Sequence, residues 1–352
     1  MKRLRARRWF VLVLALFVAA GQEYAVPSAS VAGVSIKSVN GSATASQLAV
    51  RHLAATQGGR PFGATSPWNT PTPGATKWFD TGLLHTLATP VDGSSALHWW
   101  VNTESVGVFY TGPGDPVWTF HLPVLDSVRY HRVRPATTVS VQAPANMIDG
   151  GDVDHVVVLV SGSTYYEAWN ADVNQSTRTV TTRSAEATWA IGDIVNGQGA
   201  GSPNNDGSRA SNFSWAGGLI TGDDLARGLI DHALVVALNG TMLKGGSDYV
   251  FPATAWEDNG SGPIKMGSRI GIPATVARPA GLTPLGNMVF DALQHYGAFV
   301  GDYGGGPWPQ FYADKNTVTQ AQVRPLFAFW EHGGSSDMEK IIPLLRVADY
   351  QP

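Results

Sequence analysis

Residues 149–170 decide how this chain is interpreted: Asp-Gly-Gly-Asp-Val-Asp-His, Val-Val-Val-Leu-Val, Ser-Gly-Ser-Thr, Tyr-Tyr-Glu-Ala-Trp-Asn. A β-branched run, a Gly-containing turn and an aromatic-rich run predict a β-hairpin. Asp152, Asp154 and His155 stand at the start of its first strand, and Glu167 lies inside the second. Polar groups on a strand built for burial are costly unless they are paired or used, so this hairpin is a candidate site.

The register of the hairpin determines which of these groups share a face. A three-residue loop, 161–163, pairs His155 with Trp169 and Val157 with Glu167, placing His155, Glu167 and Trp169 on one face. A two-residue turn shifts the pairing by one residue and turns Glu167 to the opposite face from His155. The sequence allows both registers, and we favour the three-residue loop.

The flanking sequence predicts a mainly β protein, an antiparallel β-sandwich or jelly roll. Short apolar segments separated by Gly and Pro recur at strand spacing. A single amphipathic helix is expected over Leu285–Tyr296, with Thr283 as N-cap, Pro284 at the first position and Gly297 as stop. Short peripheral helices are expected over Thr221–Gly228 and Ser336–Ile342. The expected strands are Leu97–Val101, Val106–Tyr110, Val117–Leu122, Thr138–Val141, Thr179–Thr182, Thr188–Ile191, Ile230–Leu238, Tyr249–Ala253, Met266–Ile272 and Ala298–Val300.

The amino terminus predicts export from the cell. Five basic residues precede an apolar run, Trp9–Ala20, that is too short to span a bilayer well, and a small-x-small site ends at Ala32. Arg7-Arg8 followed by apolar residues also fits a twin-arginine signal, so Sec and twin-arginine export remain open. We expect a signal over 1–32, a flexible linker over 33–60 and one catalytic domain over 61–352.

Composition narrows the function classes. Of 24 Lys/Arg and 27 Asp/Glu residues, five basic and one acidic residue lie in 1–32, so the mature chain has a net charge of −7. That charge disfavours nucleic acid and anionic membranes as partners. The chain has no cysteine, which excludes disulfides and thiolate chemistry, and its 12 tryptophans fit the stacking of sugar rings. We expect a soluble, monomeric secreted protein with a polysaccharide or oligosaccharide substrate, without cofactor or bound metal.

Several motifs are similar to those of a largely uncharacterised family of secreted bacterial proteins of carbohydrate-active character. They are Ser-Pro-Trp-Asn-Thr at 66–70, Tyr-Glu-Ala-Trp-Asn-Ala at 166–171, Ile-Asp-His-Ala-Leu at 230–234 and Met-Gly-Ser-Arg at 266–269. An acid two positions before the first His belongs to the family pattern. Here that position is Val153, flanked by Asp152 and Asp154. The resemblance implies an extracellular setting and no particular reaction.

The chain lacks the Gly-x-Ser-x-Gly elbow, the phosphate loop, the zinc-protease motif and the dinucleotide fingerprint. Its strand-borne acids favour a glycoside hydrolase, with Glu167 as the general acid and Asp302 or Asp154 as its partner. A polysaccharide lyase using His155, His232 or Tyr166 and a non-catalytic sugar-binding protein are the alternatives. His232 could equally be a buried core histidine. The candidate catalytic residues are Glu167, Asp302, Asp154, Asp152, His155 and His232, and the candidate substrate-binding residues are Trp169, Trp215, Tyr166, Tyr303 and Trp68.

Overall fold

The computed structural model describes residues 60–85, 101–103, 105–127, 132–151, 154–201, 207–305, 309–326 and 336–349. The expected signal, nearly all of the expected linker, Asp152 and most of the expected strand at Leu97–Val101 lie outside these ranges. Strands dominate the described part of the chain, and its helices are short. The mainly β prediction is confirmed at this level.

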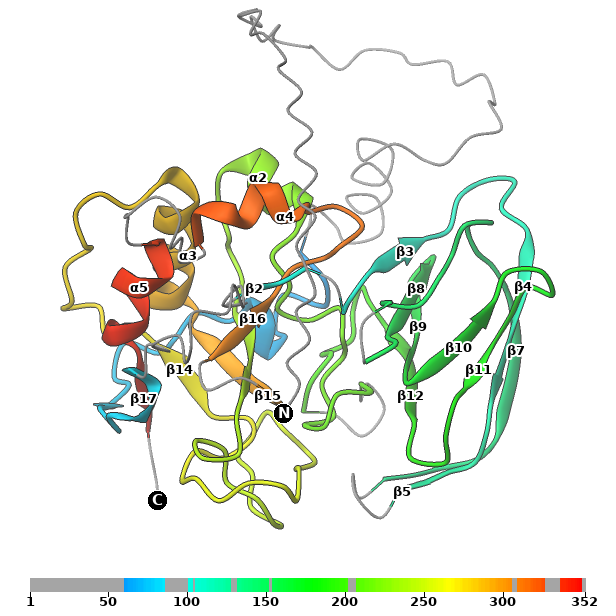
Figure 1. Cartoon of the computed structure of the whole chain (residues 1–352), viewed down its shortest axis with the longest axis horizontal. Coiled ribbons are helices and arrows are strands. Elements are labelled where there is room, and N and C mark those ends of the chain that lie inside the picture. Colours follow the sequence, from blue (N-terminus) through cyan, green and yellow to red (C-terminus); the bar gives the residue numbers. More distant parts are fainter. Residues whose placement is uncertain are drawn as a thin grey trace, which may run out of the picture. The chain divides into compact units, whose positions relative to one another are not determined.

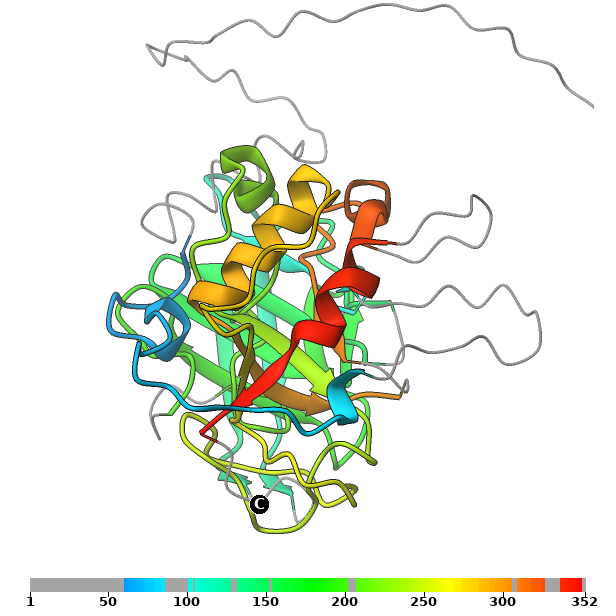
Figure 2. The ribbon, with the colours of Figure 1, turned by 90° about the vertical axis from the view of Figure 1, so that its left-hand side faces the viewer.

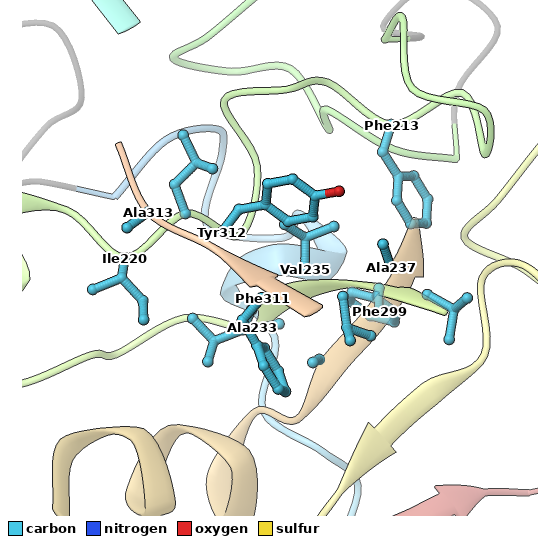
Figure 3. Packing of buried hydrophobic residues seen from close by; sticks show 14 of the residues in the cluster. Phe213, Ile220, Ala233, Val235, Ala237, Phe299, Phe311, Tyr312 and Ala313 are labelled. Carbon is cyan, nitrogen blue, oxygen red and sulfur yellow. The ribbon is translucent and has the colours of Figure 1, made fainter. Parts of the chain in front are cut away.

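A seven-stranded mixed sheet carries most of the core, in the order β1-β17-β14-β15-β13-β16-β2. Its central strands β13 and β15 run parallel, and β16 pairs antiparallel with β13. Buried apolar side chains pack around these strands, with Phe299 and Phe311 among them (Figure 3). The seven strands are Trp78–Phe79 (β1), Val101–Asn102 (β2), Leu234–Leu238 (β13), Arg269–Gly271 (β14), Ala298–Tyr303 (β15), Gln310–Tyr312 (β16) and Arg346–Ala348 (β17).

Two four-stranded sheets, ordered β10-β11-β4-β7 and β12-β9-β8-β3, share a second core (Figure 1). Phe120 and Val180 come from the first sheet, and Leu159 and Trp189 from the second. A separate pair, Leu125–Ser127 (β5) and Arg132–Arg134 (β6), forms a two-stranded ribbon. The eight strands are Val108–Tyr110 (β3), Val117–Leu122 (β4), Thr137–Gln142 (β7), Val157–Ser161 (β8), Thr164–Trp169 (β9), Ala171–Asn174 (β10), Thr179–Thr182 (β11) and Thr188–Asp193 (β12).

The sheets are mixed, whereas the sequence predicted antiparallel pairing throughout. Parallel pairs join β13 to β15, β3 to β8, β11 to β4 and β16 to β2. Parallel neighbours need a long connection, and a helix commonly supplies it. Between β13 and β15 that connection contains β14 and helix α3 (Pro284–His295), which contacts β14.

Helix α3 begins and ends where the sequence predicts. The Thr283 side chain accepts a hydrogen bond from the Gly286 N–H, and Pro284 occupies the first turn, where its missing N–H costs nothing. Leu285, Val289 and Leu293 are buried, so the predicted apolar stripe faces the core. Figure 2 shows α3 beside α5 (Asp337–Ile341), and the two are in contact.

The remaining helices are short. Helix α2 (Gly222–Arg227) lies between a capping box at Thr221 and a left-handed Gly228, as predicted. Helix α4 (Gln320–Val323) follows Thr319, and 3-10 turns lie at Pro67–Asn69, Leu83–His85, Arg324–Leu326 and Ile342–Leu344. The strand predicted over Tyr249–Ala253 is wrong: only Tyr249 forms an isolated bridge, to Met266, because Pro252 has no N–H to extend a ladder.

Candidate functional site

Five of the residues predicted from the sequence meet in one pocket of about 150 Å³. Trp169 stands at the end of β9, Asp302 and Tyr303 at the end of β15, and Asp154 and Trp215 on loops. We call this site the acidic pocket. Its other lining residues are Ser208, Ala210, Glu257 and Tyr312.

A β-bulge in β15 sets the direction of Asp302. Val300 pairs with Val236, and the next pair is Asp302 with Ala237, so Gly301 is the extra residue. Such a bulge interrupts the alternation of a strand and re-aims the side chain that follows it. A Cβ on Gly301 would stand 2.7 Å from the Val235 side chain, so the close approach of the two strands requires glycine.

Asp302 is buried and bound on both of its carboxylate oxygens. Oδ2 accepts a hydrogen bond from Nη1 of Arg209 at 2.5 Å, and Oδ1 accepts one from the Ala210 N–H at 3.0 Å. Burial raises the pKa of Asp302, and repulsion from Asp154 adds to it, while Arg209 and the Ala210 N–H act in the opposite direction. The net direction is upward, so Asp302 retains its proton to a higher pH than an ordinary aspartate.

Arg209 is completely buried between aromatic rings. Its guanidinium carbon lies 3.8 Å from the ring centroid of Trp215 and 4.6 Å from that of Tyr312. Such cation–π contacts stabilise a desolvated guanidinium together with its carboxylate partner. Burial raises the pKa of Tyr312, so its phenol stays protonated at neutral pH.

Asp154 has a different environment from that of Asp302. It is half-buried, and its Oδ1 accepts a hydrogen bond from the indole N–H of Trp169 at 3.2 Å. Its backbone carbonyl accepts the Asn170 N–H at 3.0 Å, which ties the start of the hairpin to its far end. The pocket therefore holds one enclosed carboxyl beside one that is open to solvent.

The hairpin uses the two-residue turn, so the favoured three-residue loop is wrong. Ser161 pairs with Thr164 and Val158 with Glu167. Gly162 has a φ of +60°, the conformation that glycine supplies at the first central position of such turns. Glu167 consequently shares a face with Tyr165, which packs in the main core, and not with Tyr166, which packs against Phe120 in the second core.

Glu167 lies behind the acidic pocket and does not line it. It is fully buried, and its oxygens accept hydrogen bonds from the Ser208 N–H (2.6 Å), the Ser214 hydroxyl (2.7 Å) and the Trp215 N–H (3.0 Å). Burial raises the pKa of Glu167, against the effect of these donors. Glu167 therefore stabilises the loop that contributes Ser208 and Trp215 to the pocket. It does not lie where the predicted general acid would have to be.

Both predicted histidines lie outside the acidic pocket. His155, with a φ of +44°, has Nδ1 3.3 Å from an oxygen of Asp149. His232 is buried before β13, with Nε2 3.3 Å from Asp224 and Nδ1 3.0 Å from the Ala233 carbonyl. The buried core interpretation of His232 therefore fits the structure.

Two of the predicted aromatic contacts are also core residues. Trp68 is completely buried against Phe213 and Phe299, and Tyr166 packs between the four-stranded sheets. Asp152 lies outside the described residues. Among the described residues no group of three or more His, Cys, Asp or Glu side chains could hold a metal ion. Within the same part of the chain, no helix is long and apolar enough to cross a bilayer.

Among the residues of the site that sequence reasoning missed, Glu257, Arg209 and Tyr312 carry a charge or an aromatic ring. Glu257 is almost fully buried, lines the pocket and accepts a hydrogen bond from the Asn259 amide at 3.1 Å. It comes from an irregular loop with no periodic pattern to mark it. Arg209 had a signal, because it is the only Lys or Arg between Arg183 and Arg227 and lies in the Gly/Ser-rich loop. Tyr312 had none.

No protein-family model matches this chain, and comparison with curated proteins and with solved structures finds no match. A function is therefore inferred from the geometry of the acidic pocket.

Proposed function

We propose that this protein is a secreted glycoside hydrolase whose reaction takes place in the acidic pocket. One observation carries the proposal: the pocket brings together two carboxyl groups with unlike environments, the buried Asp302 and the half-exposed Asp154, and two indole rings also line it. Acetal hydrolysis needs such a pair, one protonated and one ionised. The buried carboxyl, whose pKa is raised, takes the role of the acid, and the half-exposed one takes the other role.

Asp302 serves as the general acid. Its raised pKa favours the protonated form, and the proton passes to the glycosidic oxygen as the bond to the leaving group breaks. The carboxylate that remains is stabilised by Arg209 and by the Ala210 N–H. Asp154, oriented by the Trp169 N–H, acts as the nucleophile or as the base that activates water.

The other groups in the pocket suit a hydroxyl-rich ring. The indole N–H of Trp215 is buried and makes no hydrogen bond to any described protein atom, so it can donate to a substrate oxygen. Trp169 and Tyr303 add aromatic surface at the same site. Glu257 is a third carboxylate that can accept from a sugar hydroxyl.

The lyase alternative has less support from this geometry. The residues expected to abstract a proton, His155, His232 and Tyr166, do not line the pocket. A uronate would also meet three carboxylates there, and Arg209 is already paired with Asp302. We therefore favour hydrolysis over the lyase reaction.

Export, an extracellular site of action, a monomeric state and the resemblance to secreted bacterial carbohydrate-active proteins belong to the same proposal. We also infer that the two four-stranded sheets form a small β-sandwich, because one core lies between them.

A product screen tests the function. The mature chain is incubated with plant, algal and bacterial glycans, and new reducing ends are measured together with ultraviolet absorption. New reducing ends without absorption, lost in Asp302→Asn, support hydrolysis. Products that absorb in the ultraviolet would establish a lyase. Binding with no new ends in any glycan would leave a sugar-binding protein.

A further inference from the structure

A second depression, the neutral groove, adjoins the acidic pocket. It measures about 410 Å³, and its lining includes Asn239, Thr241, Asn259, Ser261 and Gly305. Tyr303 lines both sites and is 42% exposed, so its ring forms the boundary between them. The two sites thus share one wall.

The two sites differ in charge. None of the residues that line the neutral groove is charged, whereas three carboxylates line the acidic pocket. The groove presents amides and hydroxyls. Asn239 Oδ1 accepts from the Thr241 hydroxyl at 2.7 Å, and the Ser261 hydroxyl donates to the Gly240 carbonyl at 3.1 Å. Such groups exchange hydrogen bonds with sugar hydroxyls, and the groove provides no cation to pair with a carboxylate or sulfate.

The loop from Glu257 to Ser261 connects the two sites physically. Glu257 lines the pocket, and the Asn259 amide that hydrogen-bonds to it, at 3.1 Å, belongs to a residue lining the groove. Gly240 brings the groove floor close to the boundary residue: a Cβ there would lie 3.1 Å from Cε2 of Tyr303. A ligand that fills the groove therefore contacts the same loop and the same ring as a ligand in the pocket.

We propose that the neutral groove is a second subsite, which binds the adjacent uncharged sugar unit of a chain whose end lies in the acidic pocket. This inference rests on the proposed function and names its substrate class, a chain of neutral sugars. Binding energy from the second unit then adds to that of the first, so affinity rises with chain length.

Gly305 provides the means of testing the groove. A Cβ added at Gly305 would meet no atom within 4 Å, and the residue is not in the left-handed region, so a side chain can be added at this groove residue without strain. Gly305→Leu is the test variant, and Ser261→Phe, at an exposed groove residue, is a second one in case the first folds poorly. Gly74→Leu is the matched control, because Gly74 is exposed, meets no atom within 4 Å and lines neither site.

Affinity is measured by calorimetry in an Asp154→Asn background, in which turnover is slow. The probes are glucan, mannan and xylan oligosaccharides of one to six units. In the background and in the Gly74→Leu control, we expect affinity to rise about tenfold or more from one unit to the longer members of at least one series. Gly305→Leu and Ser261→Phe should abolish that rise while affinity for the single unit stays the same.

The inference is overturned if the length dependence persists in both groove variants, or if no member of any series binds. Its failure is distinguishable from that of the proposed function. If the wild type cleaves oligosaccharides and the groove variants cleave and bind them equally well, hydrolysis stands and the subsite falls. If nothing is cleaved but the groove variants lose the length dependence, the subsite stands and hydrolysis falls.

Discussion

The acidic pocket and the cluster around His232 use the same residue types in opposite ways. Asp302 stands at the end of β15 with one face of its surroundings open to the pocket. Asp224 is enclosed in the capping box of α2, where Thr221 donates to it through its N–H and its hydroxyl, and Arg227 and His232 complete its contacts. A buried acid whose contacts are all internal stabilises the fold, while one beside an open cavity is placed for chemistry.

The two regions also differ in which effect decides the pKa shifts of their buried groups. Burial by itself would lower the pKa of His232, but the charge of Asp224 and its hydrogen bond outweigh burial, and the net pKa is raised. The pKa of Asp224 is lowered, since His232 and Thr221 overcome the effect of burial. In the pocket, burial prevails over Arg209 and the pKa of Asp302 rises.

The largest expected effect is on activity, from Asp154→Asn. Loss of the second catalytic carboxyl group should lower kcat/KM by about 10²–10⁴-fold. The thermal midpoint should change little, because Asp154 is half-exposed. Initial rates on the glycan found in the product screen measure this effect.

Asp248→Asn is the control for that variant, since Asp248 is a half-exposed acid paired with Lys244 and Lys265 and lines neither site. It should keep full activity. An Asp154→Asn enzyme that works within a few-fold of the wild type would remove Asp154 from the mechanism.

Asp224→Ala should mainly affect stability. Removing one partner of a buried ion pair costs about 3–5 kcal/mol, because His232 and the Thr221 donors are left without an acceptor. Activity per folded molecule should be preserved. Denaturant unfolding measures the free energy, and a loss of activity larger than the loss of folded protein would contradict the structural role.

The same pair predicts a pH dependence of stability. Because the folded pKa of His232 is raised, its contribution is complete below about pH 6.5, the unfolded value, and is lost as the pH rises through the folded value. Asp224, with its lowered pKa, contributes above its unfolded value and loses that contribution as the pH falls through the folded one. The stability difference between wild type and His232→Gln should shrink on the alkaline side. A difference that stays constant with pH would show that folding does not change the pKa of His232.

Glu167→Gln should destabilise the protein by about 1–3 kcal/mol. The new NH₂ group faces donors from Ser208, Ser214 or Trp215, so at least one hydrogen bond is lost. We expect lower stability with an unchanged shape of the pH–rate profile. If the alkaline limb of that profile disappears instead, Glu167 and not Asp302 is the general acid.

The smallest expected effect comes from Trp169→Phe, which keeps an aromatic ring but removes the N–H that binds Asp154. Loss of one such hydrogen bond is worth about 0.5–1.5 kcal/mol. We expect a fall of a few-fold in kcat and no change in the thermal midpoint. An unaltered kcat would mean that Asp154 needs no orientation.

Local patterns predicted much of this fold and part of its site. Strand β4 and helix α3 were readable because alternation and capping residues are local signals. The length of the turn at Gly162 was not readable, because Ser and Gly suit loops of two and of three residues equally. The difference of one residue moved Glu167 to the other face of the hairpin, away from the role of general acid. Parallel pairing of β13 with β15 joins segments about 60 residues apart, and no local pattern encodes it.

Local patterns also determine which residues of the acidic pocket could be predicted from the sequence. Asp302 was predicted because an acid leaving a short strand through glycines is visible in sequence. Glu257 and Tyr312 were missed because only the packing of distant segments brings them to the pocket. The burial that separates the carboxyl environments is likewise a property of the assembled structure.

Gly301, the extra residue in β15, sets the direction in which the Asp302 side chain points. If β15 paired with β13 without a bulge, Gly301 would pair with Ala237 and Asp302 with Leu238, which would turn the Asp302 side chain to the opposite face of the sheet. Every amino acid of the pocket would still be in place, yet the acid would point into the opposite side of the sheet. The orientation of this group is thus specified by a count of residues rather than by their chemical identity.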